Sequence, residues 1–229
     1  MTRSSAPVPA GRSKPAWAIF LGATLIGLIA DLWTKHAAFA HIADTPVIVS
    51  REEVLGASNI NQLIPLHDAV VAVPRLLEFT LVLNPGAVFG IGAGKRWFFV
   101  VFTLFAVTLA TWLFAKKTAS KDRWAHFAFA MVVSGGLGNL YDRMRFACVR
   151  DFIHPLPNMR LPFGLAWPSG SNEVWPYVSN VADAFLLVGI GILIVYTWRR
   201  PEGDTDKATG HKDGSELGTP DSDKSINPG

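Results

Sequence analysis

The stretch WFFVVFTLFAVTLATWLFA, residues 97–115, contains nineteen residues and no charged side chain. A helix needs about 20 apolar residues to cross the hydrocarbon core of a bilayer. A second uncharged run, of fifteen residues, occupies positions 184–198. Half of all residues are hydrophobic, which a soluble domain could also reach, so the distribution decides rather than the average. The two runs predict membrane-spanning helices.

Four spans follow when the pattern is extended along the chain, and Trp and Tyr recur at their ends, as expected at a membrane–water boundary. The spans are predicted at residues 16–38, 97–115, 124–141 and 177–198. The predicted fold class is therefore an all-α integral membrane protein, with a four-transmembrane-helix bundle in one domain at 16–198.

Polar segments flank this domain, and a small sheet is expected outside the membrane. The strand-like residues 77–83 are predicted to form a β-platform with 47–49 and the segment near Ile64. Residues 1–15 and 199–229 contain too few apolar side chains to bury a core, so both termini are predicted to be disordered.

Basic residues beside the spans fall into three groups on one side of an even-numbered bundle. The groups are Arg3, Arg12 and Lys14; Lys116, Lys117, Lys121 and Arg123; and Arg199 with Arg200. Such residues stay on the cytoplasmic side, so both termini are predicted inside and the connections 39–96 and 142–176 outside. This placement, with a formal net charge of only +3, argues against a nucleic-acid surface.

A cleaved signal peptide is the alternative explanation of the first apolar run. The run has a basic start, and Ala38-Phe39-Ala40 resembles a cleavage site with small residues. Asp31 and Lys35 interrupt it where a signal peptide should be uninterrupted, which favours a retained helix.

Three acidic residues lie within or at the ends of the predicted spans, where a charged side chain is costly and needs a reason. At 1.5 Å per residue, Asp31 and Asp142 lie ~26 Å and ~27 Å from the cytoplasmic starts of their helices. Asp183 lies ~24 Å from the cytoplasmic end of its helix on the same arithmetic. Three helices therefore bring a carboxyl group to nearly the same depth, close to the outer boundary.

Polar side chains share a helical face with these acids, at spacings of three and four residues. The neighbours are Lys35 for Asp31, Asn139 (itself four residues before Arg143) for Asp142, and Asn180 for Asp183. Lys35 can neutralise Asp31, which favours a structural role for that pair. Asp183 has no basic residue within a turn, so it most needs an explanation.

Two carboxyl groups that face each other at low dielectric share a proton, so one can act as a base and the other as an acid. Such a pair can activate water against a peptide carbonyl and protonate the departing amine. Alternatively, Asp142 and Asp183 are interfacial acids that contact water or Arg143. The spacing alone does not separate these two interpretations.

Five segments, in order along residues 31–183, resemble the motifs of the lipoprotein signal peptidase (signal peptidase II) family. They are Asp31-Leu-Trp-Thr-Lys35 (D-x-x-T/S-K), Asn84-Pro-Gly-Ala-Val-Phe89 (N-x-G-A-x-F), Ser134-Gly-Gly-Leu-Gly-Asn139-Leu-Tyr-Asp142-Arg143 (G-G-x-x-G-N-x-x-D-R), Val149-Arg-Asp-Phe152 (V-x-D-F) and Asn180-Val-Ala-Asp183 (N-x-A-D). Ser134 replaces the first Gly of the third motif. The third and fifth motifs are specific in combination.

The resemblance implies a multi-pass aspartic endopeptidase of the bacterial inner membrane. It would cleave the signal peptide of a prolipoprotein just before a Cys that carries diacylglycerol, at an active site near the outer face. The implied residues are Asp142 and Asp183 as the catalytic dyad, Asn139, Arg143 and Asn180 as positioning residues, Asn84 and Gly86 beside the scissile bond, and Asp31 with Lys35 as a brace. No metal or organic cofactor is implied. The partners would be lipidated prolipoproteins and membrane lipid, and a monomer is expected.

The outer connections 41–73 and 155–176 are longer than the family pattern leads us to expect, so substrate access is where this chain should differ. A proton-coupled transporter is the alternative from another class. It predicts acids near the midplane and an internal repeat, neither of which is found. A non-catalytic scaffold is a third class, in which facing Asp pairs would be a liability. No histidine pair has metalloprotease spacing, and the single Cys148 excludes an internal disulfide.

Overall fold

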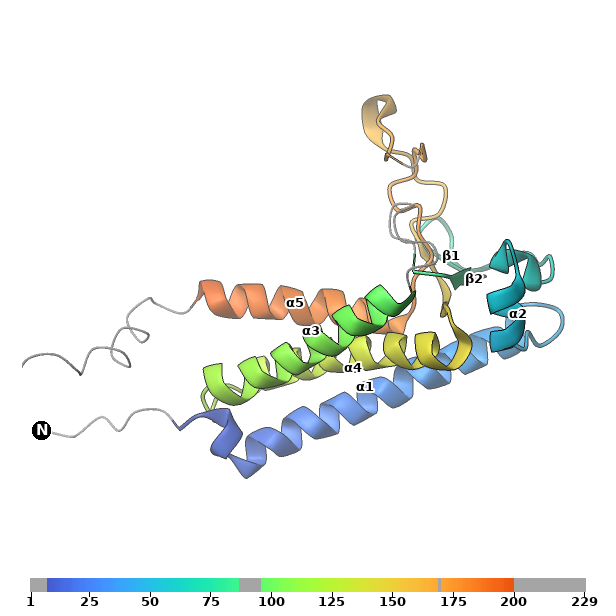
Figure 1. The fold of residues 1–229 in the computed structure, drawn as a ribbon. Helices are drawn as coiled ribbons and strands as arrows, with labels where there is room; N and C mark the ends of the chain where they lie inside the picture. Colours follow the sequence, from blue (N-terminus) through green and yellow to red (C-terminus); the bar gives the residue numbers. More distant parts are fainter. Residues whose placement is uncertain (1–7, 87–95, 169, 200–229) are drawn as a thin grey trace, which may run out of the picture.

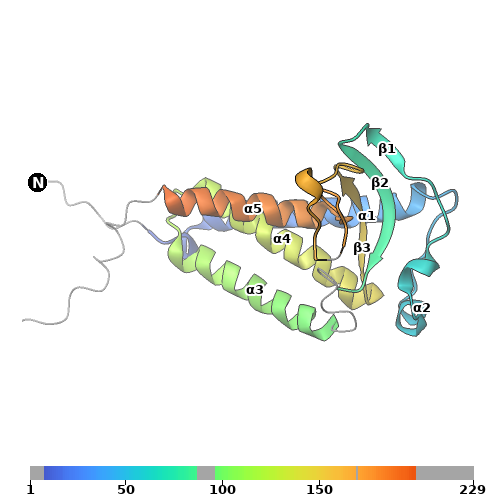
Figure 2. The same cartoon turned by 90° about the horizontal axis from the view of Figure 1, so that it is seen from above.

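The computed structural model describes residues 8–86, 96–168 and 170–199. Four long helices lie side by side, and a small sheet with short helices covers one end of them (Figures 1 and 2). The long helices are α1 (Lys14–His41), α3 (Arg96–Lys117), α4 (Arg123–Phe146) and α5 (Val181–Trp198). The short helical elements are η1 (Ala10–Arg12), α2 (Arg51–Gly56), η2 (Ile60–Leu63) and η3 (Pro162–Gly164).

Three helices of the described part of the chain, α1, α3 and α5, are long and apolar enough to cross a membrane. The fourth long helix, α4, has 24 residues but is less apolar, and it contacts each of the other three. Twelve of its residues are buried, against three in α3, so α4 faces protein where α3 exposes apolar side chains. The described residues thus contain three helices with membrane-span composition, while a count of four spans stays a prediction.

Glycines let the neighbouring helices approach α4 closely. A Cβ atom on Gly135 would lie 2.4 Å from the carbonyl oxygen of Ala182 in α5. A Cβ atom on Gly138 would lie 2.2 Å from Oδ2 of Asp31 in α1. Small residues at helix contacts are the usual means of close packing in membranes. These contacts bring the polar ends of three helices together.

The opposite end of the bundle carries the described members of the basic groups, which include Arg12, Lys117 and Arg199. The backbone N–H of Ala10 donates to Thr118 (2.9 Å) and that of Ser120 donates to Val8 (2.8 Å), which ties the start of the described chain to the α3–α4 turn. Residues 8–13 thus contact the α3–α4 turn, within the segment 1–15 that was predicted to be disordered. Ala10 is small enough to be fully buried there. Residues 1–7 and 200–229 of the predicted disordered termini lie outside the described residues.

The sheet has three antiparallel strands in the order β1 (Val70–Val73), β2 (Leu77–Asn84) and β3 (Val149–Pro155). Leu83 pairs with Arg150 and Asn84 with Val149, so the end of β2 lies beside the start of β3. A buried apolar cluster joins the sheet to the end of α1 and includes Phe39, Leu81 and Phe152. The sheet is thereby held over one end of the bundle.

The predicted composition of this platform was wrong for two segments. Residues 47–49 and the segment near Ile64 are not strands, whereas β3 was not predicted. The N–H of Val47 donates instead to Phe39 at the end of α1 (2.8 Å), and Val47, Val49 and Ile64 pack against the buried cluster. These short apolar segments therefore bury their side chains against the end of α1 and do not pair as strands.

Two helix boundaries also differ from the prediction. Helix α4 continues to Phe146 and ends at Ala147, which has φ 65°, so Asp142 lies inside the helix. Helix α5 starts at Val181 rather than at residue 177, because Asn180 and Asp183 form a capping box. Residue Ser179 forms an isolated bridge with Ile153 of β3 instead.

Candidate functional site

The predicted site residues meet where the sheet covers the bundle. Helix α1 contributes Asp31 and Lys35, and α4 contributes Asn139, Asp142 and Arg143. Asn84 ends β2 and Gly86 follows it, while Asn180 caps the start of α5 and Asp183 lies in its first turn. Two residues of β3, Arg150 and Asp151, join them although the sequence analysis gave neither a role. Residues 87–89 of the Asn84 motif lie outside the described residues.

Lys35 lies at the centre of the helical part of this cluster and is fully buried. Its Nζ lies 2.8 Å from Oδ2 of Asp31, 2.9 Å from Oδ1 of Asn139 and 3.5 Å from Oδ2 of Asp142. Oδ1 of Asp31 accepts from the N–H of Ala182 in α5 (2.9 Å). The Asp31–Lys35 pair therefore connects α1 to both α4 and α5.

Asp142 is fully buried and is held by cations. Nη2 of Arg150 donates to its Oδ1 (2.8 Å), and the backbone N–H of Arg150 donates to its Oδ2 (3.0 Å). Lys35 approaches the same Oδ2. Both oxygens of Asp142 are thus engaged, and its contact with the Arg150 backbone fixes the start of β3 on α4.

Asp183 has different surroundings. Its Oδ1 accepts from Nδ2 of Asn139 (2.8 Å), and its Oδ2 accepts from the backbone N–H of Asn180 (3.2 Å). The Asn180 side chain accepts from the N–H of Asp183 in return (3.1 Å), which completes the capping box. Asp183 is partly exposed, so amide donors hold a carboxyl group that still reaches the surface.

Asp151 is the acid that the sequence analysis missed. Nδ2 of Asn180 donates to its Oδ1 (2.6 Å), and Nδ2 of Asn84 donates to its Oδ2 (3.1 Å). Burial, reinforced by the charge of Asp183, raises the pKa of Asp151 to about 7. Asn180 contacts both carboxyl groups, Asp151 through its side chain and Asp183 through its backbone. The available signal was the segment Val149-Arg-Asp-Phe152, in which Asp151 matches the acid of the V-x-D-F motif.

Arg143 and Gly86 lie at the edge of the cluster. The guanidinium of Arg143 lies 5.3 Å from the ring centroid of Phe99, and its Nη1 donates to the carbonyl of Asn139 (3.3 Å). The N–H of Gly86 donates to Oδ1 of Asn84 (2.9 Å), which orients the amide that contacts Asp151. Gly86 has φ 99°, and a Cβ atom there would lie 2.7 Å from the Phe99 ring, so only glycine fits.

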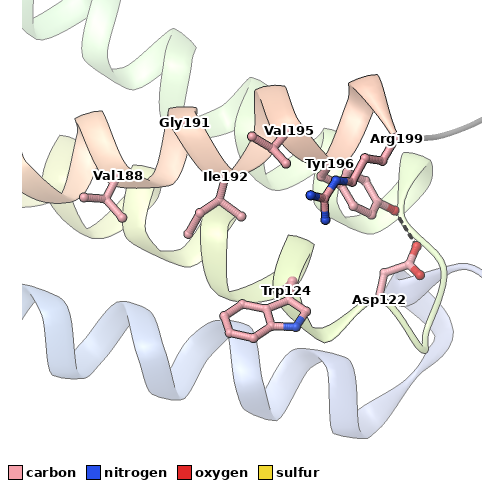
Figure 3. Close-up of a pocket in the computed structure, with 8 residues that line it drawn as sticks. All are labelled: Asp122, Trp124, Val188, Gly191, Ile192, Val195, Tyr196 and Arg199. Carbon is pink, nitrogen blue, oxygen red and sulfur yellow. Dashed lines mark hydrogen bonds between the residues drawn. The ribbon is translucent and has the colours of Figure 1, made fainter.

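A cavity of about 710 Å³ lies away from these acids, between the start of α4 and the last turns of α5 (Figure 3). Its wall is mostly apolar, with Trp124 opposite Val188 and Ile192 of α5. At its polar end, the Tyr196 hydroxyl donates to Asp122. It shares no residue with the acid cluster. Among the described residues, no group of three His, Cys, Asp or Glu side chains is placed to hold a metal ion.

Comparison with known solved structures concerns the fold. The chain resembles a bacterial membrane enzyme structure solved in meso at 2.3 Å, with a TM-score of 0.55 and 21% identity over 93% of this chain and 99% of the other. A second bacterial membrane enzyme structure, at 1.9 Å, gives a TM-score of 0.54 and 22% identity over 79% and 93% of the two chains. The chain therefore shares the fold of membrane enzymes.

Comparison with known sequences concerns the family. A lipoprotein signal peptidase of Streptococcus pyogenes serotype M5 (strain Manfredo) is 32% identical over 139 residues, which is 61% of this chain and 80% of that protein. A lipoprotein signal peptidase of Desulfitobacterium hafniense (strain DSM 10664 / DCB-2) is 29% identical over 56% of this chain and 73% of that protein. The family model described as "Signal peptidase (SPase) II" matches residues 23–199. With the resemblance of the five motifs confirmed in this way, the chain belongs to the signal peptidase II, or lipoprotein signal peptidase, family.

Proposed function

We propose that this peptidase is an aspartic endopeptidase in which Asp151 and Asp183 activate the attacking water. Its substrate would be a diacylglyceryl-modified prolipoprotein, cleaved just before the lipidated Cys. Family membership supports the substrate class, because the relatives are named lipoprotein signal peptidases. The observation that carries the mechanism is that Asn180 contacts two carboxyl groups, of which one is buried with a pKa near 7 and the other is partly exposed.

This pair departs from the expected dyad of Asp142 and Asp183. Both oxygens of Asp142 are engaged by Arg150 and Lys35, so neither is open to a water molecule. We assign Asp142 a positioning role instead. It binds the Arg150 backbone directly before Asp151, and successive residues of a strand point to opposite faces. Asp142 thereby holds β3 so that Asp151 faces Asn180.

The reaction needs one carboxyl group with a proton and one without. At neutral pH Asp151 is protonated in a large fraction of molecules, because its pKa lies near 7. Asp183 accepts a proton from water as the water oxygen bonds to the scissile carbonyl carbon, and Asp151 donates its proton toward the carbonyl oxygen. Collapse of the tetrahedral intermediate breaks the C–N bond, the proton held by Asp183 passes to the departing amine, and a hydroxyl proton of the intermediate returns to Asp151.

The surrounding polar residues would then position this pair. Asn180 and Asn84 donate to Asp151, and Asn139 donates to Asp183. Arg143 and Gly86, at the edge of the cluster, would contact the substrate backbone. Asp31 and Lys35 would brace the helices beneath.

The proposed topology has four spans, with α4 as the central one and both termini in the cytoplasm of a bacterial inner membrane. The acid cluster lies at the end of the bundle opposite to the described basic groups, which supports an active site near the outer face. A substrate could then keep its diacylglycerol in the bilayer while its peptide bond reaches water. We propose that the enzyme acts as a monomer.

The test is cleavage by the purified protein of a prolipoprotein that carries diacylglycerol, compared with the same precursor without the lipid. Cleavage of only the lipidated form, with the new N-terminus at the modified Cys, is the expected result. Equal cleavage of both forms would contradict the substrate class. Reporter fusions at Lys117 and Ser58 test the topology separately, since they should report cytoplasmic and external locations, respectively.

A further inference from the structure

An arm leaves the sheet after β3 and returns to α5. It comprises residues 156–168 and 170–175, and its two sides are joined by backbone bonds from Leu161 to Asn172 (2.7 Å) and from Val174 to Met159 (2.6 Å). Trp167 adds a bond from its indole to the carbonyl of Glu173 (2.8 Å). These bonds give the arm a defined backbone structure. It lies within the connection 155–176, which is longer than the family pattern leads us to expect.

The tip of the arm, residues 161–168, has the sequence LPFGLAWP and carries no charge. Phe163 is 98% exposed, and Leu165 is 57% exposed. Phe163 also has φ 59°, a left-handed backbone that is uncommon for a bulky residue. A strained turn therefore presents an aromatic side chain outward, with almost no contact to the rest of the described chain.

The position of the tip identifies what could cover it. Figure 1 shows the arm, in gold, extending sideways from the sheet rather than along the bundle axis. In both Figure 1 and Figure 2, η3 at the tip lies on the helix side of the sheet, at the level of the first turns of α5. Helix α5 has span composition and exposes Leu187, Val188 and Ile190. On the proposed topology the first turns of α5, which precede these residues, lie at the outer membrane boundary.

We propose that the tip of the arm inserts into the outer interface of the bilayer, with Phe163 and Leu165 among the lipid headgroups and upper acyl chains. The partner is a lipid surface, since the tip is uncharged, apolar and continuous in depth with the apolar face of α5. Aromatic and leucine side chains are the residues that partition into this zone. The insertion would hold the sheet, and β3 with it, at a constant height above the membrane.

The test is site-specific labelling of introduced cysteines, which is possible because the single native cysteine is buried. Cys148 is fully buried, and burial raises the pKa of its thiol to about 12, so a cysteine introduced on the surface reacts selectively. Phe163→Cys and Leu165→Cys are labelled with an environment-sensitive fluorophore, and the full-length proteins are reconstituted into phosphatidylethanolamine–phosphatidylglycerol vesicles. Asn172→Cys, an exposed position on the returning side of the arm, is the matched control.

The labels at 163 and 165 should shift to the blue on reconstitution and be quenched by lipids that carry a quencher near the headgroup, while the label at 172 should stay in water. Equal, water-like emission at 163, 165 and 172 would overturn the proposal. None of these readings depends on peptidase activity, so they are independent of the proposed reaction.

Discussion

Two groups of acids lie side by side at the covered end of the bundle, and their partners differ. Asp31 and Asp142 are fully buried and contact Lys35 or Arg150, which carry positive charge. Asp151 and Asp183 contact the side-chain amides of Asn84, Asn139 and Asn180. The first group is charge-balanced by cations, whereas amides orient the second group without neutralising it.

This difference indicates a structural role for the cation-paired acids and a role in proton transfer for the amide-held acids. A buried carboxylate paired with a cation is costly to disturb, because removing one partner leaves the other charge uncompensated. A carboxyl group held by amides can gain or lose a proton without leaving a buried cation alone. The second group is therefore suited to proton transfer, and the first is suited to holding three helices and a strand in register.

The largest expected effect comes from the amide-held pair. Asp151→Asn and Asp183→Asn should each lower kcat by at least about 10²–10⁴-fold, the range for loss of a general acid or base. Thermal unfolding of the purified variants should change little by comparison. Turnover of lipidated precursor, normalised to folded protein, is the measurement.

The double variant sharpens this test. Residues that act as one unit are strongly non-additive, so Asp151→Asn combined with Asp183→Asn should be hardly slower than either single variant. Multiplication of the two single effects would show that the carboxyl groups act independently, and the shared mechanism would then be abandoned.

Asp142→Asn should behave in the opposite way. It leaves Arg150 without its buried counter-charge and Lys35 with Asp31 alone, and loss of one partner of a buried ion pair costs about 3–5 kcal/mol of stability. Lower yield and a lower Tm should therefore exceed the loss of turnover per folded molecule. If Asp142→Asn instead unfolds like the parent protein and has no activity, the positioning role assigned to Asp142 is wrong.

A glycine pair tests the packing that supports the cation-held group. Gly138→Ala places a Cβ atom against Asp31 and should destabilise the protein by about 1–3 kcal/mol, as overpacking does. Gly191→Ala, which meets nothing within 4 Å beside the cavity of Figure 3, should leave Tm and activity unchanged. Equal Tm values for the two variants would contradict the close packing of α1 against α4 at Gly138.

The smallest expected effect is a shift in pH dependence. As pH rises through about 7, Asp151 loses the proton that it donates, so kcat/KM should fall on this limb. Asn84 donates to Asp151 and lowers its pKa, so Asn84→Ala should move the limb to higher pH. If the pH at which kcat/KM falls is the same in Asn84→Ala as in the parent protein, a group other than Asp151 controls this fall.

The same pKa has a consequence for stability that the parent protein should show. The pKa of Asp151 is raised from 3.8, so the folded state binds more protons than the unfolded state between about pH 4 and 7. Its contribution to stability therefore falls as pH rises through this window, and Asp151→Asn should remove that part of the pH dependence of Tm.

The sequence predicted the helices well because their signals are local. Uncharged runs and flanking basic residues located α1, α3 and α5, and helical spacing correctly grouped Asp31 with Lys35. The sheet was less predictable, because strand identity depended on distant partners. Residues 47–49 have strand-like composition, yet Val47 bonds to the end of α1.

The part of the site that sequence analysis missed has the same cause. Asp151 lies outside any span, so the argument from the cost of intramembrane charge did not apply to it. It reaches Asn180 because Ala147 ends α4 in a left-handed turn and because β3 pairs with β2 in the register that sets Asn84 beside Val149. Neither the turn nor the register has a signal within a short window of sequence.

The less apolar character of α4 bears on how the protein is made. On the proposed topology, α4 leaves the ribosome after α3 but before α5, and on its own it would carry Asn139, Asp142 and Arg143 into lipid. The short turn to α3 allows the two helices to insert as a hairpin, with α1 already present to supply Lys35. Asn180 and Asp183 arrive only with α5. On the proposed mechanism, the nascent chain therefore lacks one of its two catalytic carboxyl groups until its last helix has been synthesised.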